Sequence, residues 1–136
     1  MKAIEDAEHR TSGEIRVSVS TYFWGNVRRV AEKAFARLGM TRTRQRNGVL
    51  FFIVPSRRRF VVLGDEGIHA RVGQEFWDSL SEILSEKFRK GEFREGLVEA
   101  IEKAGEMLAA HFPYDTATDI NELPDTIDLE EPAHKK

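Results

Sequence analysis

The sequence predicts an α/β fold: a three-layer α/β/α sandwich with a small mixed sheet. An alternating apolar stretch and a continuously apolar stretch are separated by a helical pattern, a second apolar run follows a short turn, and two helical stripes come last. A helix between two strands predicts one parallel βαβ crossover, and the short turn predicts a β-hairpin. The two C-terminal helices then cover one face of the sheet.

The chain of 136 residues divides by composition into a predicted domain over 1–112 and an acidic, flexible tail over 113–136. The tail carries seven acidic residues against two lysines, a net charge of −5. The acidic residues are Asp115, Asp119, Glu122, Asp125, Asp128, Glu130 and Glu131. The remainder holds 19 basic and 16 acidic side chains, or +3, which is too small for a nucleic-acid footprint.

The first predicted elements are a helix and a strand. Residues 3–10 have the spacing of the last turns of an amphipathic helix, which Gly13 is expected to stop. The alternation of apolar and polar residues from Ile15 to Val19 predicts a half-buried strand that ends near Tyr22.

A helix and a buried strand are expected next. Apolar residues from Val27 to Leu38 follow helical spacing, and Gly39 supplies the end of that helix. The arginine-rich segment 41–46 is expected to be a solvated connection. The run Val49–Val54 is continuously apolar, which is typical of a strand covered on both faces.

The hairpin and the last two helices complete the expected order. A turn at Pro55–Arg57 would place Val54 opposite Arg58 and Asn47 opposite Asp65. Two helical stripes separated by a glycine follow. They comprise Phe76, Trp77, Leu80, Ile83, Leu84 and Phe88, and then Phe93, Leu97, Ile101, Ala104 and Leu108.

The open end of the predicted hairpin is the best candidate site. Asn47 precedes its first strand, and Asp65 and Glu66 follow its second strand between two glycines. Carboxylate and amide oxygens are suitable ligands for calcium or magnesium, although Arg46 puts a positive charge at the same place. Alternatively, the acidic residues simply turn the chain and charge the N-terminus of the next helix.

The closed end of the hairpin is a candidate anion-binding or partner-binding patch. Guanidinium groups favour phosphate and carboxylate, and a neighbouring aromatic side chain could add a contact surface. The alternative is a solvated, charged turn. The residues of this patch are Arg28, Arg29, Arg57, Arg58, Arg59 and Trp24.

Several classes of chemistry lack their motifs. The chain has no cysteine, its four histidines show no HExxH spacing, and it contains no Walker glycine loop or GxGxxG. No apolar run approaches the roughly 20 residues of a membrane helix, and no secretory h-region follows Met1. We therefore expect a soluble domain without membrane insertion, located in the cytoplasm or associated with a membrane through a partner.

Four short segments carry a family resemblance. They are Ser12-Gly13-Glu14-Ile15-Arg16-Val17, Asn47-Gly48-Val49-Leu50, Gly64-Asp65-Glu66-Gly67-Ile68 and Phe88-x-x-Gly91-x-Phe93-x-x-Gly96-Leu97. Over about residues 3–112 the chain resembles the TPM-domain family, in a short bacterial branch. The resemblance implies an α/β/α sandwich. Acid phosphatase activity and calcium binding have been associated with some members, and the family includes thylakoid-lumen proteins.

The chain departs from the family pattern at Arg46, where an aspartate commonly precedes Asn-Gly. Replacing a metal-ligating carboxylate by a guanidinium reverses the local charge and should lower cation affinity. Three hypotheses follow. The first is a protein-interaction or accessory module without established catalysis. The second is a metal-dependent phosphomonoesterase that uses Asp65, Glu66 and Asn47. The third is a domain in which Arg46 clamps Asp65 as a built-in cation.

Overall fold

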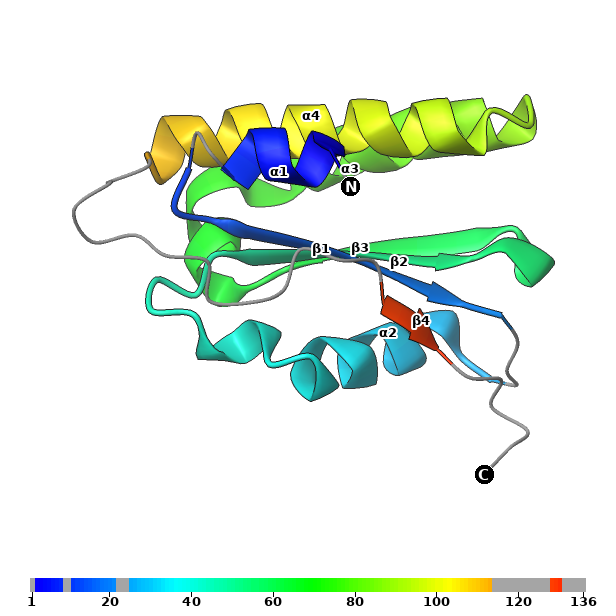
Figure 1. Ribbon diagram of the computed structural model, residues 1–136, viewed down its shortest axis with the longest axis horizontal. Helices are drawn as coiled ribbons and strands as arrows, with labels where there is room; N and C mark the ends of the chain where they lie inside the picture. The colour runs from blue at the N-terminus through cyan, green and yellow to red at the C-terminus, as the bar shows by residue number, and fades with distance from the viewer. Residues whose placement is uncertain (1, 9–10, 22–24, 114–127, 131–136) are drawn as a thin grey trace.

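The computed structural model of the protein describes residues 2–8, 11–21, 25–113 and 128–130 (Figure 1). The helices are α1 (Lys2–Glu8), α2 (Val27–Arg37), α3 (Glu66–Arg89) and α4 (Phe93–His111). The strands are β1 (Glu14–Ser20), β2 (Gly48–Val54), β3 (Arg59–Gly64) and β4 (Asp128–Glu130). Short 3₁₀ turns span Met40–Arg42 and Pro55–Arg57.

The strands form one mixed sheet in the order β3-β2-β1-β4. β1 runs parallel to β2 and to β4, whereas β2 and β3 are antiparallel. The helix α2 connects β1 to β2, so the predicted parallel crossover and the predicted hairpin are both confirmed.

Helices cover both faces of the sheet, which confirms the three-layer sandwich. α2 lies on one face, and α1, α3 and α4 lie on the other (Figure 1). The neighbouring residues Phe51 and Phe52 are both fully buried, and they belong to the two separate apolar clusters. Because successive side chains of a strand point to opposite faces, a continuously apolar β2 fills both cores at once.

The predicted register of the hairpin is wrong by one residue. Val54 pairs with Arg59 rather than Arg58, and Gly48 rather than Asn47 lies beside Asp65. The reason is the turn: after the 3₁₀ turn, Arg58 takes a left-handed conformation with φ 52°, and this adds a residue to the loop.

The prediction that β1 is half-buried is also wrong. Its polar residues Arg16 and Ser18 are only 7% and 0% exposed. Arg16 and Ser18 pair in register with Leu50 and Phe52 of β2, whose face of the sheet is covered by α2, so the alternation of β1 does not correspond to a solvated face.

Gly13 has a role that differs from the expected one, and a glycine inside α3 breaks that helix. α1 ends at Glu8, and a Cβ at Gly13 would lie 2.9 Å from the side chain of Leu108, so this glycine permits close packing rather than stopping a helix. Residues 9–10 of the expected helix lie outside the described part. α3 begins ten residues before its predicted apolar stripe at Phe76 and is broken at Gly73, where φ is 74° and ψ is 179°.

The acidic segment after α4 contributes β4 to the sheet, and its boundary at residue 112 stays a prediction. In the part of the chain that the structure describes, every helix is too short or too polar to cross a lipid bilayer.

Candidate functional site

The open end of the hairpin lies where β2 begins and where β3 passes into α3. Arg46 takes a left-handed conformation with φ 52° two residues before β2 begins, and Asp65 is the N-cap of α3. The Asp65 N–H donates to the carbonyl of Gly48 at 2.9 Å, which continues the hairpin pairing to its last residue. Residues from both strands therefore meet at a helix N-terminus.

Arg46 forms a two-pronged ion pair with Asp65. Its Nε donates to Asp65 Oδ2 at 2.6 Å, and its second terminal nitrogen donates to Oδ1 at 2.9 Å. The first terminal nitrogen lies 3.3 Å from Glu66 Oε2. Paired N–H···O bonds of this kind fix both direction and distance. The guanidinium thus lies between the two carboxylates that the sequence indicated as metal ligands.

The ion pair joins an accessible cation to a nearly buried carboxylate. The hydrogen bond to Asp65 raises the pKa of Arg46, against an opposing effect of desolvation, and the charges of Asp65 and Glu66 add to the increase. Asp65 is 6% exposed, whereas 40% of the Arg46 side chain is accessible. A nearly buried carboxylate is therefore neutralised by a half-exposed cation.

Asn47 is buried and is tied to the framework around β1. Its side-chain nitrogen donates to Ser12 Oγ at 3.3 Å, and its backbone N–H donates to Thr43 Oγ1 at 3.2 Å. Its carbonyl accepts from the Glu14 N–H at 3.3 Å. These bonds join the loop before β2 to the start of β1.

The backbone of Gly67 fits closely against the loop that carries Arg46. A Cβ at this position would lie 2.1 Å from the carbonyl oxygen of Gln45 and 2.6 Å from that of Arg46. The Gly67 N–H instead donates to the Arg46 carbonyl at 2.9 Å. Glycine at 67 therefore allows the first turn of α3 to hold the loop in place.

The closed end of the hairpin brings arginines from two elements to one end of the sheet. Arg57 donates to the carbonyl of Gly25 at 2.8 Å, and Ser56 Oγ donates to the carbonyl of Thr21 at 2.8 Å. These bonds attach the turn to the connection between β1 and α2. Four side chains of the predicted patch are exposed there, namely Arg28, Arg29, Arg58 and Arg59. Trp24 lies outside the described residues.

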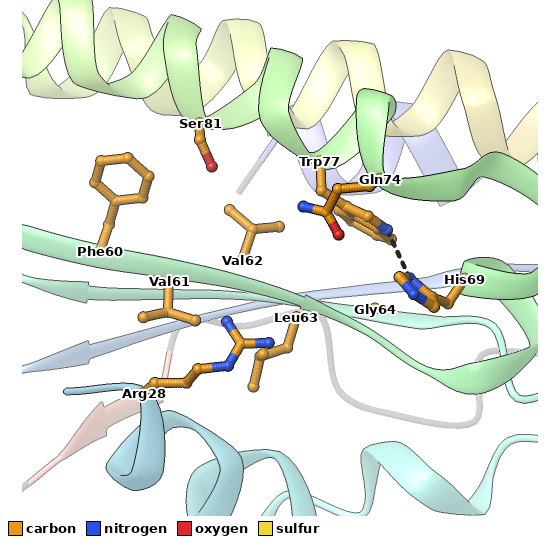
Figure 2. Close-up of a pocket in the computed structure, with 10 residues that line it drawn as sticks. All are labelled: Arg28, Phe60, Val61, Val62, Leu63, Gly64, His69, Gln74, Trp77 and Ser81. Atoms are coloured by element: carbon orange, nitrogen blue, oxygen red, sulfur yellow. Dashed lines mark hydrogen bonds between the residues drawn. The ribbon is translucent and has the colours of Figure 1, made fainter. Parts of the chain in front are cut away.

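Sequence reasoning missed a third place, a cavity of about 210 Å³ beside β3 (Figure 2). Phe60 and Val62 point toward α3, Val61 and Leu63 point toward α2, and Arg28 reaches in from α2. Trp77 Nε1 donates to His69 Nδ1 at 3.1 Å across one end of the cavity. The usable signal was topological: β3 follows β2 and is followed by a helix, so it could have been expected at an edge.

Within the described residues, His, Cys, Asp and Glu side chains nowhere gather in a group of three or more suited to a metal ion. The donors at the open end also fit a cation poorly. Asp65 already accepts two bonds from Arg46, and its Oδ1 accepts a third from the Glu66 N–H at 2.8 Å. A metal would have to compete with a tethered positive charge.

A comparison with protein families matched the TPM-domain model over residues 1–107. The chain belongs to the TPM-domain family. The architecture expected from that family agrees with the sandwich described above. A comparison with curated proteins found no match.

Two of the solved structures that resemble this TPM domain are NMR structures of bacterial proteins. The NMR structure of the BA42 protein from the psychrophilic bacterium Bizionia argentinensis is 42% identical in sequence and has a TM-score of 0.88. That match covers 95% of this chain and 88% of BA42. The N-terminal domain of a protein from P. gingivalis is 19% identical with a TM-score of 0.64, covers 82% and 72% of the two chains, and shares the fold.

Proposed function

We propose that this TPM domain is a protein-interaction or accessory module in which Arg46 takes the place of a metal ion. The observation that carries the proposal is the contact of Arg46 with both oxygens of Asp65 and with Glu66. A chain with this arrangement keeps the shape of the open end without a dissociable cation, and so does not depend on metal for its function.

Charge supports this assignment. Arg46, Asp65 and Glu66 together carry one positive and two negative charges, whereas Ca²⁺ sites gather several anionic oxygens among six to eight ligands. The guanidinium is held at an effectively fixed position by its own chain, so an incoming cation meets both repulsion and occupied lone pairs.

The closed end of the hairpin supports a binding role. Exposed arginines of the turn and of α2 lie on a surface that is held by the Arg57–Gly25 and Ser56–Thr21 hydrogen bonds. Cations that a turn holds in place recognise carboxylate-rich or phosphate-rich partners at lower entropic cost than cations on mobile segments. A partner of negative charge is therefore the class that this module suits.

The testing experiment is a titration of the isotope-labelled protein with calcium and then magnesium, following the amides of Asn47, Asp65 and Glu66. The proposal expects no saturable shift at millimolar metal, and hydrolysis of p-nitrophenyl phosphate that is unchanged by either metal or by chelator. Saturable shifts confined to those amides would refute the claim that Arg46 takes the place of a metal ion. Turnover that depends on metal would refute the non-catalytic role.

A second candidate is a metal-dependent phosphomonoesterase. The observation that favours it is the partial exposure of Arg46 beside the N-terminus of α3, a position where guanidinium and helix dipole both attract a phosphate group. In this candidate Asp65, Glu66 and Asn47 would hold calcium or magnesium, which would polarise the phosphoryl oxygen, and Arg46 would steady the anion. Turnover that rises with metal and is lost in Glu66→Gln, an exposed position, would support the enzyme.

A further inference from the structure

β3 is an outer strand of the sheet. It pairs with β2 on one side, and no described segment pairs with its other side. Its residues are mostly half-buried, in contrast to β2, which is buried along its whole length. At the opposite edge, the short acidic segment β4 already lies against β1. One edge of the sheet therefore already pairs with a short acidic strand, β4. The other edge, β3, has no paired strand among the described residues.

The hairpin register shows which backbone groups face outward. In an antiparallel pair, residues alternate between pointing their N–H and C=O at the partner strand and pointing them away. The Asp65 N–H points at β2, where it donates to Gly48. Counting back by twos, the N–H and C=O groups of Phe60, Val62 and Gly64 face away from β2, and these are the groups that another strand could bind.

A groove follows this outer edge. The 210 Å³ cavity of Figure 2 follows the edge of β3 from Gly64 to Phe60, with residues of α3 on one side and Arg28 of α2 on the other. A second cavity of about 320 Å³ shares Phe60 and continues past Ser85 and Phe88. The six residues of β3 span about 20 Å, enough for a segment of similar length to lie extended beside them.

The groove carries a surplus of positive charge, with one arginine, Arg28, also paired with Glu32 on α2, Nε to Oε2 at 3.5 Å. The residues that line the two cavities include Arg28, Arg58 and Arg89, and no aspartate or glutamate is among them. Arg28 enters from α2, Arg58 from the hairpin turn and Arg89 from the end of α3. Arg28 thus lines the cavity that runs along Phe60–Gly64, whereas Arg58 and Arg89 line the cavity at the Phe60 end of that row.

We infer that the outer edge of β3 binds an extended acidic segment of a partner protein as an added strand. This inference rests on the proposed interaction role and names its partner class and its site. Main-chain bonds to Phe60, Val62 and Gly64 would supply the pairing, and Arg28, Arg58 and Arg89 would select carboxylates. Two copies of β3 pairing edge to edge would instead bring their arginines together, which disfavours self-association.

The probe is an end-blocked peptide of alternating glutamate and valine, titrated into the labelled full chain. The largest amide shifts are expected at Phe60, Val62 and Gly64, and a peptide of alternating lysine and valine should not bind. N-methylation of a peptide amide that faces β3 should weaken binding by about tenfold, the effect of one lost hydrogen bond, whereas methylation of the next amide should not. That alternation distinguishes an added strand from attraction of carboxylates alone.

Charge variants provide a second measurement. Arg28→Gln and Arg89→Gln, both at exposed positions, should each weaken binding of the acidic peptide several-fold. Arg94→Gln is the matched control, because Arg94 is an exposed arginine on α4 outside the groove. Equal effects of the two N-methyl positions, or of Arg89→Gln and Arg94→Gln, would overturn the inference.

The outcomes separate this inference from the proposed function. Binding of the acidic peptide with shifts elsewhere, such as at Arg94 and Lys103 of α4, would refute the β3 site and leave an interaction module. No binding at all would also refute the site, while the metal titration described above independently decides whether Arg46 replaces a cation.

Discussion

The indole ring of Trp77 lies directly over Gly64. A Cβ at Gly64 would be 2.3 Å from the indole Cη2 and 2.4 Å from Cζ2, which is far inside van der Waals contact. The ring is 8% exposed, and its N–H is held by His69. Absence of a side chain at position 64 therefore fixes where the tryptophan can pack, and with it one wall of the groove beside β3.

Gly64→Ala should destabilise the fold by about 1–3 kcal/mol, because the ring must shift and give up its bond to His69. Urea unfolding followed by far-UV circular dichroism would measure the loss, because Trp77→Phe removes the indole that fluorescence would report. The double variant with Trp77→Phe should lose less than the sum of the single variants, since the smaller ring leaves room for the methyl group. Strict additivity of the two changes would contradict the contact.

Gly73→Ala should also destabilise the protein, by about 1–3 kcal/mol, because the combination of φ 74° and ψ 179° is essentially confined to glycine. Gly91→Asn is the control: Gly91 also has a positive φ, 78°, but follows the end of α3, where asparagine is tolerated. Thermal unfolding of both variants compares them. Equal stability of Gly73→Ala and the parent chain would show that the break in α3 is not imposed by this residue.

Asp65→Ala should lower the free energy of unfolding by about 1 kcal/mol from the lost helix cap alone, and by more because Arg46 loses its partner. A double-mutant cycle of Arg46→Gln and Asp65→Asn should give a favourable coupling energy, with Arg42→Gln as a control from the same loop. Zero coupling would mean that the ion pair contributes nothing to folding.

The same pair has a defined pH dependence on the arginine side. The pKa of Arg46 is raised in the folded protein, so its contribution is fully present below the unfolded-state pKa and is lost only as pH rises through the folded-state value. Coupling measured at neutral pH and at about pH 10 should therefore agree, because both lie below the arginine titration. A fall in the Arg46–Asp65 coupling energy over that interval would contradict a raised pKa for Arg46.

Arg46→Asp should create calcium affinity, because it replaces the guanidinium with a third carboxylate beside Asp65 and Glu66. A dissociation constant on the order of millimolar is expected for so small a set of ligands. Calorimetry or amide shifts would detect it, and Arg42→Asp makes the same charge change at a neighbouring exposed position. Equal calcium binding by the two variants would show a general charge effect rather than a site.

The sequence pattern predicted most of the fold because apolar spacing directly reports which faces are covered. Val49–Val54 is continuously apolar, and it forms the strand between two cores. The pattern failed where tertiary context overrides it. Ser18 looks solvated by alternation but is buried on the sheet face that α2 covers, and the left-handed Arg58 that shifts the hairpin register has no signature in a run of three arginines.

For the site, sequence placed Arg46 near Asp65 because both were expected at the open end of a hairpin. It did not reveal that the loop backbone contacts Gly67, since that contact depends on how α3 starts. The groove at β3 escaped sequence reasoning because Phe60 and Trp77 carry the same apolar signal whether they line a surface groove or a core.

The start of β1 is joined to the end of α4 by the bonds from Thr11 Oγ1 and the Ser12 N–H to the carbonyl of Phe112. These partners are separated by about a hundred positions in the chain, so closing them requires a long loop to be ordered first. During synthesis, β1 is therefore made long before α4, and the contacts at the start of β1 cannot form until α4 has been made. We expect this domain to fold in one late, cooperative step after α4 has left the ribosome, rather than progressively from its N-terminus.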